Sequence, residues 1–247
     1  MTQTADRDWT PYQPARQQAR DVVTADGRRY RIVVSTPEAS APAQGYPSIL
    51  VLDGVQHFAA MSDGASALSR RPQKTGVEPM VVIGVFHGDG QALDADARSR
   101  DYTSVAPPQG ELVGKAFGGA EAFRRTLSDV VLPLVSNYLP LDPSRRALFG
   151  HSLGGLFVLE ALAQQPDLFT RWVSISPSLW WRDDLRLEGG GALLLGIGER
   201  EQRRDMVGRT QAFAQRSSAR LLIAPNADHG SAPLALLPDA LRHATAR

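Results

Sequence analysis

The sequence has no cysteine among its 247 residues. This excludes disulfide bonds, thiolate metal sites and a cysteine nucleophile, so any covalent catalysis must use another side chain. The chain also lacks the residue spacings that bind metals and the glycine-rich loop that cradles a phosphate. We therefore expect no cofactor and no bound metal.

The sequence also has no marked excess of positive or of negative residues. Lys and Arg number 27 against 26 Asp and Glu, which gives a formal net charge of +1. The basic residues are spread along the chain, whereas a nucleic-acid-binding surface needs them gathered on one segment or face. Binding to nucleic acid is therefore not expected.

Long hydrophobic runs are also absent, and the N-terminus is polar and charged, without the apolar core of a secretion signal. We therefore expect a cytoplasmic protein that makes no contact with a membrane. The length suits one α/β domain. Because Pro11 and Pro14 discourage regular pairing, we expect an extended arm over residues 1–18 and a single domain over residues 19–247.

Short apolar runs alternate with segments of helical spacing, which predicts a mostly parallel sheet with helices on both of its faces. Asp26-Gly27 favours a tight turn, so the strands on either side of it should form an antiparallel hairpin at the N-terminal edge. Continuous apolar runs are typical of strands buried on both faces. The expected strands are residues 20–24, 29–35, 48–52, 80–86, 147–149, 172–175, 192–197 and 220–224.

The segments between these runs predict five helices. Pro133 should kink the second of them or mark a boundary within it, because proline has no N–H and its ring clashes with the preceding turn. Residues 88–119 show little periodicity, which predicts a long irregular segment near the ligand crevice of the sheet. The expected helices are residues 58–68, 120–138, 153–165, 204–216 and 232–244.

Gly150-His151-Ser152-Leu153-Gly154 matches the pattern G-x-S-x-G, with a short apolar strand before it and a helical pattern after it. In this context a sharp strand-to-helix turn would lift the serine hydroxyl clear of the sheet and point the helix N-terminus at a developing oxyanion. The segment therefore predicts an α/β-hydrolase fold with Ser152 as the nucleophile. The simpler alternative is a glycine-rich turn in which Ser152 only caps the helix.

A nucleophilic serine needs a base, and in this fold the base follows the last strand. His229 lies in the loop after residues 220–224, so we interpret it as the general base. The other histidines have weaker claims: His57 and His87 could line the crevice, His151 should point away from the nucleophile, and His243 should lie on the surface.

The acid that orients His229 should follow the preceding strand, where Glu199 and Glu201 both occur and Asp205 lies farther on. Spacing alone leaves Glu199 and Glu201 open. The oxyanion hole should use the amide of Leu153 and a second amide, from Gly54 or Val55, after an earlier strand. Asp53 there is interpreted as a cap or turn residue.

Further motifs occur in order from about residue 20 to the C-terminus. They are Leu52-Asp53-Gly54, Arg100-Asp101-Tyr102-Thr103, Gly118-Gly119-Ala120, Ser176-Pro177-Ser178-Leu179-Trp180-Trp181, Gly198-Glu199-Arg200-Glu201 and Asp228-His229-Gly230-Ser231. With the serine motif, they resemble the putative-esterase family, which includes esterase D, enterochelin and salmochelin esterases and mycolyltransferases. The siderophore-esterase branch is the most similar.

The resemblance favours Glu201 as the acid, with Glu199 in reserve, although some siderophore esterases work with a Ser–His dyad. It also implies an ester substrate. Trp180 and Trp181 could stack on an aryl or catechol group, or else pack into the core. Arg98 and Arg100, with the adjacent Tyr102, could bind an anionic substrate, and the alternative for Arg100 is an ion pair with Asp101.

The expected function is hydrolysis of a carboxylic ester through an acyl-serine intermediate, on a small molecule such as a catecholate siderophore lactone or an aryl ester. An acyltransferase, a thioesterase or an S-formylglutathione hydrolase would use the same residues. A non-catalytic binding protein is disfavoured, because Ser152, His229 and a carboxylate all occur where catalysis needs them. The oligomeric state does not follow from the sequence.

Overall fold

The computed structural model describes residues 14–108, 116–187 and 192–246. The expected arm over residues 1–18 falls largely outside the described residues. Strand β1 (Gln17–Val23) already includes the last two residues of that expected arm. Within the described ranges, no helix is both long and apolar enough to cross a membrane.

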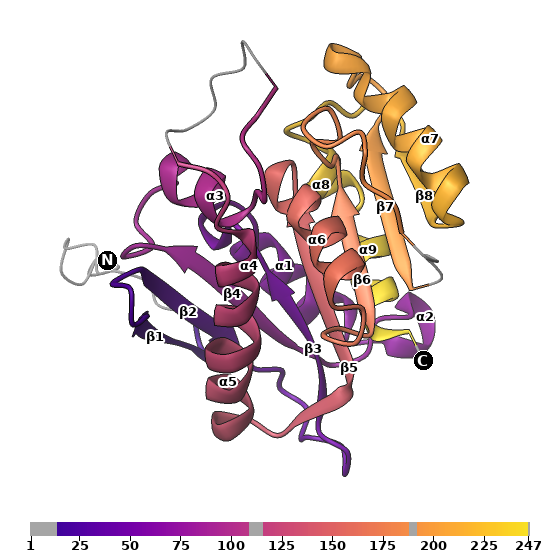
Figure 1. Ribbon diagram of the computed structural model, residues 1–247. Coiled ribbons are helices and arrows are strands. Elements are labelled where there is room, and N and C mark those ends of the chain that lie inside the picture. Colours follow the sequence, from indigo (N-terminus) through magenta and orange to yellow (C-terminus); the bar gives the residue numbers. More distant parts are fainter. Residues whose placement is uncertain (1–13, 109–115, 188–191, 247) are drawn as a thin grey trace, which may run out of the picture.

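Eight strands form one sheet in the order β1-β2-β4-β3-β5-β6-β7-β8 (Figure 1). The hairpin of β1 and β2 (Arg29–Ser35) is antiparallel, and β2 also runs antiparallel to β4 (Val81–His87). From β4 onward all neighbouring strands are parallel, so the predicted sheet is confirmed. The remaining strands are β3 (Tyr46–Val51), β5 (Leu141–His151), β6 (Arg171–Ile175), β7 (Leu193–Gly198) and β8 (Arg220–Ala224).

Helices cover both faces of this sheet (Figure 1). Successive strand residues point to opposite faces, so Leu50 and Leu148 join one core while Ile49 and Phe149 join the other. The first core is covered by α4 (Ala120–Thr126), α5 (Leu132–Tyr138), α6 (Leu153–Gln164) and α7 (Met206–Ser217). The second core is covered by α1 (Gly54–Leu68) and α9 (Leu237–Thr245).

Prolines divide two of the expected helices. Ahead of Pro133, the turn Leu127–Val131 is a π-helix in which the Leu132 N–H donates to the Leu127 carbonyl. This wider turn joins α4 to α5 and accommodates a residue that has no N–H of its own. The C-terminal segment forms α8 (Ala232–Ala235) and α9, with Pro238 in the first turn of α9.

The interpretation of residues 88–119 as irregular is wrong for part of that range. It contains α3 (Ala95–Asp101), whose N-cap Asp94 accepts a hydrogen bond from the Ala97 N–H at 2.9 Å. This seven-residue helix buries only Ala97, Ser99 and Asp101, so no apolar stripe marked it in the sequence. Residues 109–115 lie outside the described residues. A second short helix, α2 (Pro72–Thr75), was not expected either.

Asp101 fastens α3 to the sheet. Its fully buried carboxylate accepts hydrogen bonds from the Tyr30 hydroxyl of β2 at 2.7 Å and from Arg100 Nε at 2.7 Å, and it lies 3.2 Å from His87 Nε2 of β4. Burial alone would raise the pKa of Asp101, but the hydrogen bonds from His87, Arg100 and Tyr30 hold it below its ordinary value. These bonds therefore hold α3, which carries Arg98, in place against the sheet.

Replacing Asp101 by Ala should lower the free energy of unfolding by about 3 kcal/mol or more, because buried cationic and polar partners are left unsatisfied. A lowered pKa stabilises the fold above the pKa of the unfolded chain, so the difference from wild type should shrink as the pH falls through the acidic range. Urea denaturation at several pH values measures both effects.

The matched control is Asp21→Ala, since Asp21 forms an ion pair with Arg31 on the exposed side of the hairpin. Solvent screens that pair, so its loss should be much smaller. Equal losses in the two variants would contradict the anchoring role of Asp101.

Candidate active site

The site lies where the parallel strands change winding direction. β3 and β5 are neighbours, and the helices that follow them, α1 and α6, pack on opposite faces of the sheet (Figure 1). Such a switch point leaves a crevice at the carboxyl ends of the strands. Ser152 occupies the turn from β5 into α6, with φ 59° and ψ −118°. Its N–H donates to the Ile175 carbonyl of β6 at 3.0 Å, which holds this strained turn against the sheet.

Glycine is required beside Ser152 because the backbone folds back on itself. A Cβ on Gly150 would lie only 2.1 Å from the Gly154 carbonyl oxygen. A Cβ on Gly155 would lie 3.0 Å from the Ile175 carbonyl oxygen. Gly150, which begins the motif, is thus needed for the sharp turn from strand to helix, and Gly155, just after the motif, lets α6 approach β6 closely. A Cβ on Gly154 would meet only ordinary contacts.

Ser152, His229 and Glu201 form a continuous line of hydrogen bonds. The Ser152 Oγ lies 3.1 Å from His229 Nε2, and His229 Nδ1 lies 2.6 Å from Glu201 Oε2. The other Glu201 oxygen accepts from the Ser176 hydroxyl at 2.5 Å and from the Gly198 N–H at 2.7 Å. With both of its oxygens bonded, the buried carboxylate is suited to hold the Nδ1–H tautomer and leave Nε2 facing the serine.

Glu199 has a different place. Its carboxylate is on the surface and accepts from the Asn226 N–H at 2.7 Å, at the start of the loop that carries His229. Of the two carboxylates that spacing left open, Glu201 is therefore the one that reaches the histidine.

The loop of His229 is shaped by its own hydrogen bonds. Asp228 accepts from the Ser231 N–H at 2.9 Å and from the Ser231 hydroxyl at 2.6 Å, and these bonds lower the pKa of Asp228. The Ala227 carbonyl accepts from the Arg200 N–H at 2.9 Å. A Cβ on Gly198 would lie 2.6 Å from that carbonyl oxygen, so only glycine lets the acid and base loops approach so closely.

The amides expected to form the oxyanion hole begin two helices at this edge. Leu153 is the first residue of α6, while Gly54 and Val55 are the first two residues of α1. The first N–H groups of a helix have no partner within it, so they can bind an anion. The preceding Asp53 has φ 51°, and its N–H donates to the Tyr102 hydroxyl at 3.1 Å.

Asp53 would place a negative charge beside these amides if it were unpaired. Its fully buried carboxylate accepts two hydrogen bonds from Arg98, from Nε and one terminal nitrogen, both at 2.8 Å. Burial by itself lowers the pKa of Arg98, but the Asp53 carboxylate outweighs it and raises that pKa overall. Arg98 therefore stays charged and neutralises Asp53 near the reacting serine.

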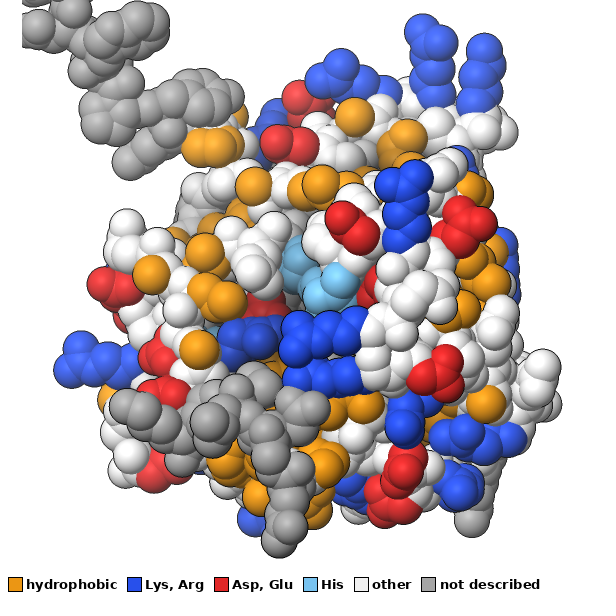
Figure 2. All heavy atoms as spheres, turned by 90° about the horizontal axis from the view of Figure 1, so that it is seen from above, with side chains coloured by type: hydrophobic (Ala, Val, Ile, Leu, Met, Phe, Trp, Pro, Cys, Tyr) orange, Lys and Arg blue, Asp and Glu red, His pale blue; other side chains and the backbone are white. Residues whose placement is uncertain are grey.

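A cavity of about 370 Å³ opens beside Ser152. Figure 2 shows histidine side chains at the bottom of a hollow on this side of the molecule, with basic side chains next to them. Four arginines line the cavity, against the two acids Glu201 and Asp228. Its lining residues are Arg98, Ser152, Leu153, Ser178, Trp180, Arg200, Glu201, Arg203, Arg204, Met206, Asp228 and His229.

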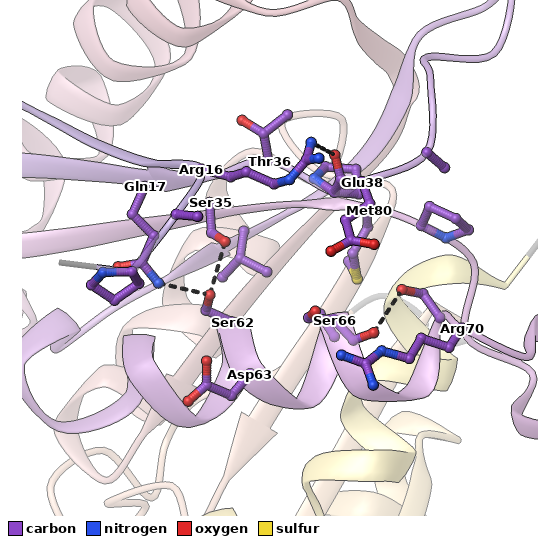
Figure 3. A pocket seen from close by; sticks show the side chains of 18 residues that line it. Arg16, Gln17, Ser35, Thr36, Glu38, Ser62, Asp63, Ser66, Arg70 and Met80 are labelled. Atoms are coloured by element: carbon purple, nitrogen blue, oxygen red, sulfur yellow. Dashed lines mark hydrogen bonds between the residues drawn. The ribbon is translucent and has the colours of Figure 1, made fainter. Parts of the chain in front are cut away.

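Another cavity, of about 490 Å³, is larger but lies between the hairpin and α1 (Figure 3). Its lining side chains bond to one another: Gln17 Nε2 donates to Ser62 Oγ at 3.1 Å, and the Ser62 hydroxyl donates to Ser35 Oγ at 2.8 Å. It contains none of the residues Ser152, His229 and Glu201. Within the described ranges, no group of three His, Asp or Glu side chains is placed to hold a metal ion.

The expected substrate-binding residues separate into two groups. Arg98 and the half-buried Trp180 line the cavity. Tyr102, Trp181 and Arg100 do not. The interpretation of Tyr102 as a substrate contact is wrong, and Trp181 and Arg100 adopt the alternatives, packing into the core and pairing with Asp101. Tyr102 is fully buried beneath Asp53, while Trp181 is 4% exposed and donates to the Val105 carbonyl at 3.0 Å. Arg100 forms the alternative ion pair with Asp101.

Arg203 and Arg204 were missed in the sequence. They lie in a 3₁₀ turn (Arg203–Asp205) before α7. Because φ is positive at Arg204 (57°) and Asp205 (52°), α7 begins only at Met206 and not at residue 204 as expected. The Arg204 guanidinium stacks 3.7 Å from the centre of a Trp180 ring. The run of arginines after Glu201 was a usable signal, but nothing in it indicated a turn toward the serine.

The other histidines also differ from expectation. His151 does not point away from the site, because its ring packs on the ring of His229, with centroids 4.5 Å apart. His87 is buried against Asp101, and His57 packs against His151 without lining the cavity. His243 is half-buried and lies 2.9 Å from the Ala192 carbonyl oxygen, so it is not simply a surface residue.

The sequence pattern described as "Putative esterase" matches residues 24–226 of this chain. The ferri-bacillibactin esterase BesA of Bacillus subtilis (strain 168) is 36% identical over 163 residues, covering 63% of this chain and 56% of that protein. The chain thus spans about half the length of the curated relatives it matches.

Solved structures resemble the chain over nearly its whole length. The BES protein from Bacillus cereus superposes with a TM-score of 0.88 at 24% identity, covering 99% of this chain and 100% of that one. The enterobactin and salmochelin hydrolase IroE superposes with a TM-score of 0.75 at 28% identity, covering 94% and 95%. These likenesses confirm the predicted α/β-hydrolase fold.

Changing Glu201 to Gln should lower kcat on any hydrolysed ester by roughly 10² to 10⁴, because an amide can donate to His229 and stabilise the wrong tautomer. Glu199→Gln, which alters a neighbouring surface carboxylate, should change kcat by less than about threefold. Steady-state kinetics with thermal unfolding as a check on folding measures both. Equal effects of the two substitutions would contradict the role assigned to Glu201.

Proposed function

The chain belongs to the putative-esterase family, and we propose that it is a serine esterase that hydrolyses a carboxylic ester through an acyl-serine intermediate. The observation that carries this proposal is the line of hydrogen bonds from Glu201 through His229 to Ser152, at the side of a cavity lined by Trp180 and arginines. A nucleophile, a base within 3.1 Å and a buried orienting acid are the parts that nucleophilic catalysis needs.

In the proposed reaction, Ser152 Oγ attacks the ester carbonyl while His229 Nε2 takes its proton. The N–H groups of Leu153 and of Gly54 or Val55 bind the oxyanion of the tetrahedral intermediate. His229 then donates the proton to the departing alkoxide, which leaves the acyl group on Ser152. A water molecule, deprotonated by His229, repeats the sequence and releases the acid. Glu201 keeps the imidazole in one tautomer and stabilises the imidazolium that forms twice.

For the substrate we propose a catecholate siderophore ester, bound in its iron-loaded form. A ferric catecholate complex combines aromatic rings with net negative charge. Trp180 offers a ring face, and Arg98, Arg203 and Arg204 bring positive charge to the same cavity. The names of similar proteins support this class, since BesA is a ferri-bacillibactin esterase and IroE hydrolyses enterobactin and salmochelin.

Arg98 contributes less to binding than expected from the sequence, because Asp53 already takes two of its nitrogens. The exposed Arg203 is the better candidate for selective contact with an anionic ligand. One continuous sheet from β1 to β8 supports the prediction that residues 19–247 form a single domain. The cytoplasmic location stays a prediction.

The nucleophile can be tested without knowing the substrate. A fluorophosphonate probe should label wild-type protein at Ser152, fail to label Ser152→Ala, and label His229→Ala far more slowly. Loss of the serine should reduce kcat on an activated ester by about 10⁴-fold or more. Peptide mapping of the labelled protein identifies the modified residue. Label on another residue, or unchanged labelling of Ser152→Ala, would show that the assignment is wrong.

The substrate class can be tested with Arg203→Ala. Wild-type protein should favour a ferric catecholate trilactone over a short p-nitrophenyl ester by more than about tenfold in kcat/KM, since only the lactone uses a charge-assisted contact worth roughly 1.5–3 kcal/mol. Arg203→Ala should lose most of that preference and leave the neutral ester unaffected. Measuring the iron-free lactone in parallel shows whether the preference depends on the anionic, iron-loaded form.

The matched control is Arg125→Ala, which removes an exposed arginine of α4 whose partner is Glu121. It should behave as wild type with all three substrates. Equal kcat/KM for the ferric lactone and the neutral ester, with no effect of Arg203→Ala, would leave a general carboxylesterase and contradict the siderophore proposal.

A further inference from the structure

Three histidine rings lie in contact from α1 to the base. His57 of α1 meets His151 edge to face, with centroids 5.3 Å apart and an interplanar angle of 86°. His151, at the end of β5, in turn packs on His229 with centroids 4.5 Å apart and an angle of 41°. Figure 2 shows histidine side chains gathered at the bottom of the hollow. The proposed reaction uses only His229.

The base needs support that Ser152 and Glu201 do not provide. Both contact His229 through its ring nitrogens, that is, within the plane of the imidazole. The His229 side chain is 45% exposed and sits on a loop, so much of its surface is open to solvent. His151 supplies the contact that packs against the ring itself. Without it, the imidazole could tilt while its loop stayed in place.

His151 is suited to this position because it stays uncharged. His151 is 8% exposed, and burial above all, with the electrostatic influence of His229, His57 and Arg98, places its pKa well below its ordinary value. A backbone hydrogen bond with His229 opposes these effects without cancelling them. His151 Nε2 is buried and has no hydrogen-bond partner among the described residues. A charged ring here would oppose the imidazolium that His229 must form.

We propose that His151 is a positioning residue for the general base: a neutral, polar ring that holds the His229 imidazole in line with Ser152 and Glu201 and tolerates its charge during the reaction. This rests on the function proposed above, in which His229 is the base. His57, whose own Nε2 is buried without a partner in the described part of the chain, backs His151 from α1.

Two substitutions test separately the contribution of the aromatic ring of His151 and that of its polarity. His151→Phe keeps an aromatic ring of similar shape but presents a non-polar surface to the imidazolium. His151→Gln keeps a polar group but removes the ring that packs on His229. The control is His243→Phe, which replaces a half-buried histidine on α9, outside the cavity. Thermal unfolding of all three variants establishes that they fold.

The measurement is the rate of Ser152 phosphonylation by a fluorophosphonate probe across a range of pH. His151→Phe should lower the plateau rate by about tenfold and move the acid limb of the profile to lower pH, because the imidazolium of His229 is less stabilised. His151→Gln should lower the plateau similarly with little movement of the limb. For an activated ester, both variants should lower kcat while KM changes by less than about twofold.

A wild-type plateau and limb in the folded Phe and Gln variants would overturn the proposal for His151 and leave the esterase function intact. Failure of the wild-type protein to react, or unchanged reaction of His229→Ala, would instead contradict the proposed function itself. His243→Phe should match wild type in both plateau and limb. A shift as large in that control would also overturn the proposal, because the effect would then not be specific to the ring beside the base.

Discussion

The strained turn at Ser152 is the constraint on which the rest of the site depends. A positive φ at a residue with a side chain costs free energy, so the surrounding structure must enforce it. Here β6 accepts the Ser152 N–H, α6 is buried along its first nine residues, and glycines allow the backbone to close on itself. His229, Glu201 and the amides of the oxyanion hole can act in the proposed reaction only because the Ser152 hydroxyl is held at this point.

Buried carboxylates determine which arginines remain for a substrate. Asp101 takes Arg100, and Asp53 takes two nitrogens of Arg98, because an unpaired charge in the interior is costly. These pairs hold α3 against the sheet and cancel a negative charge near the oxyanion amides. Outside these pairs, the arginines that line the cavity are Arg200, in the loop after β7, and Arg203 and Arg204, in the turn before α7, where Arg204 also stacks on Trp180. The two arginines in these pairs thus lie on α3, whereas the other arginines that line the cavity lie between β7 and α7.

The histidine that performs the proposed chemistry is held by loops. Glu201 lies after β7 and His229 after β8, and a glycine at position 198 lets the two loops touch. Loops are more mobile than strands, so a base carried on one needs contacts that keep its ring in place. Glu201 supplies one such contact in the plane of the ring, and the packing of His151 supplies another on the ring itself.

Local patterns in the sequence were enough to predict the sheet, the sharp turn at Ser152 and the loop of His229. Apolar periodicity, turn glycines and the order of motifs along the chain can all be seen without knowing which distant residues pack together. Spacing alone left Glu199 and Glu201 open, because both follow the same strand, and the family resemblance favoured Glu201. The tertiary structure shows which carboxylate is buried beside His229. The tertiary structure also decided the burial of Tyr102 and Trp181, because their hydrogen-bond partners are distant in the chain. The pairing of Arg100 with the adjacent Asp101 was an alternative already stated from the sequence. His151 was expected to point away from the site, and only the fold placed its ring on the base, since side-chain packing between β5 and a loop after β8 leaves no local signal.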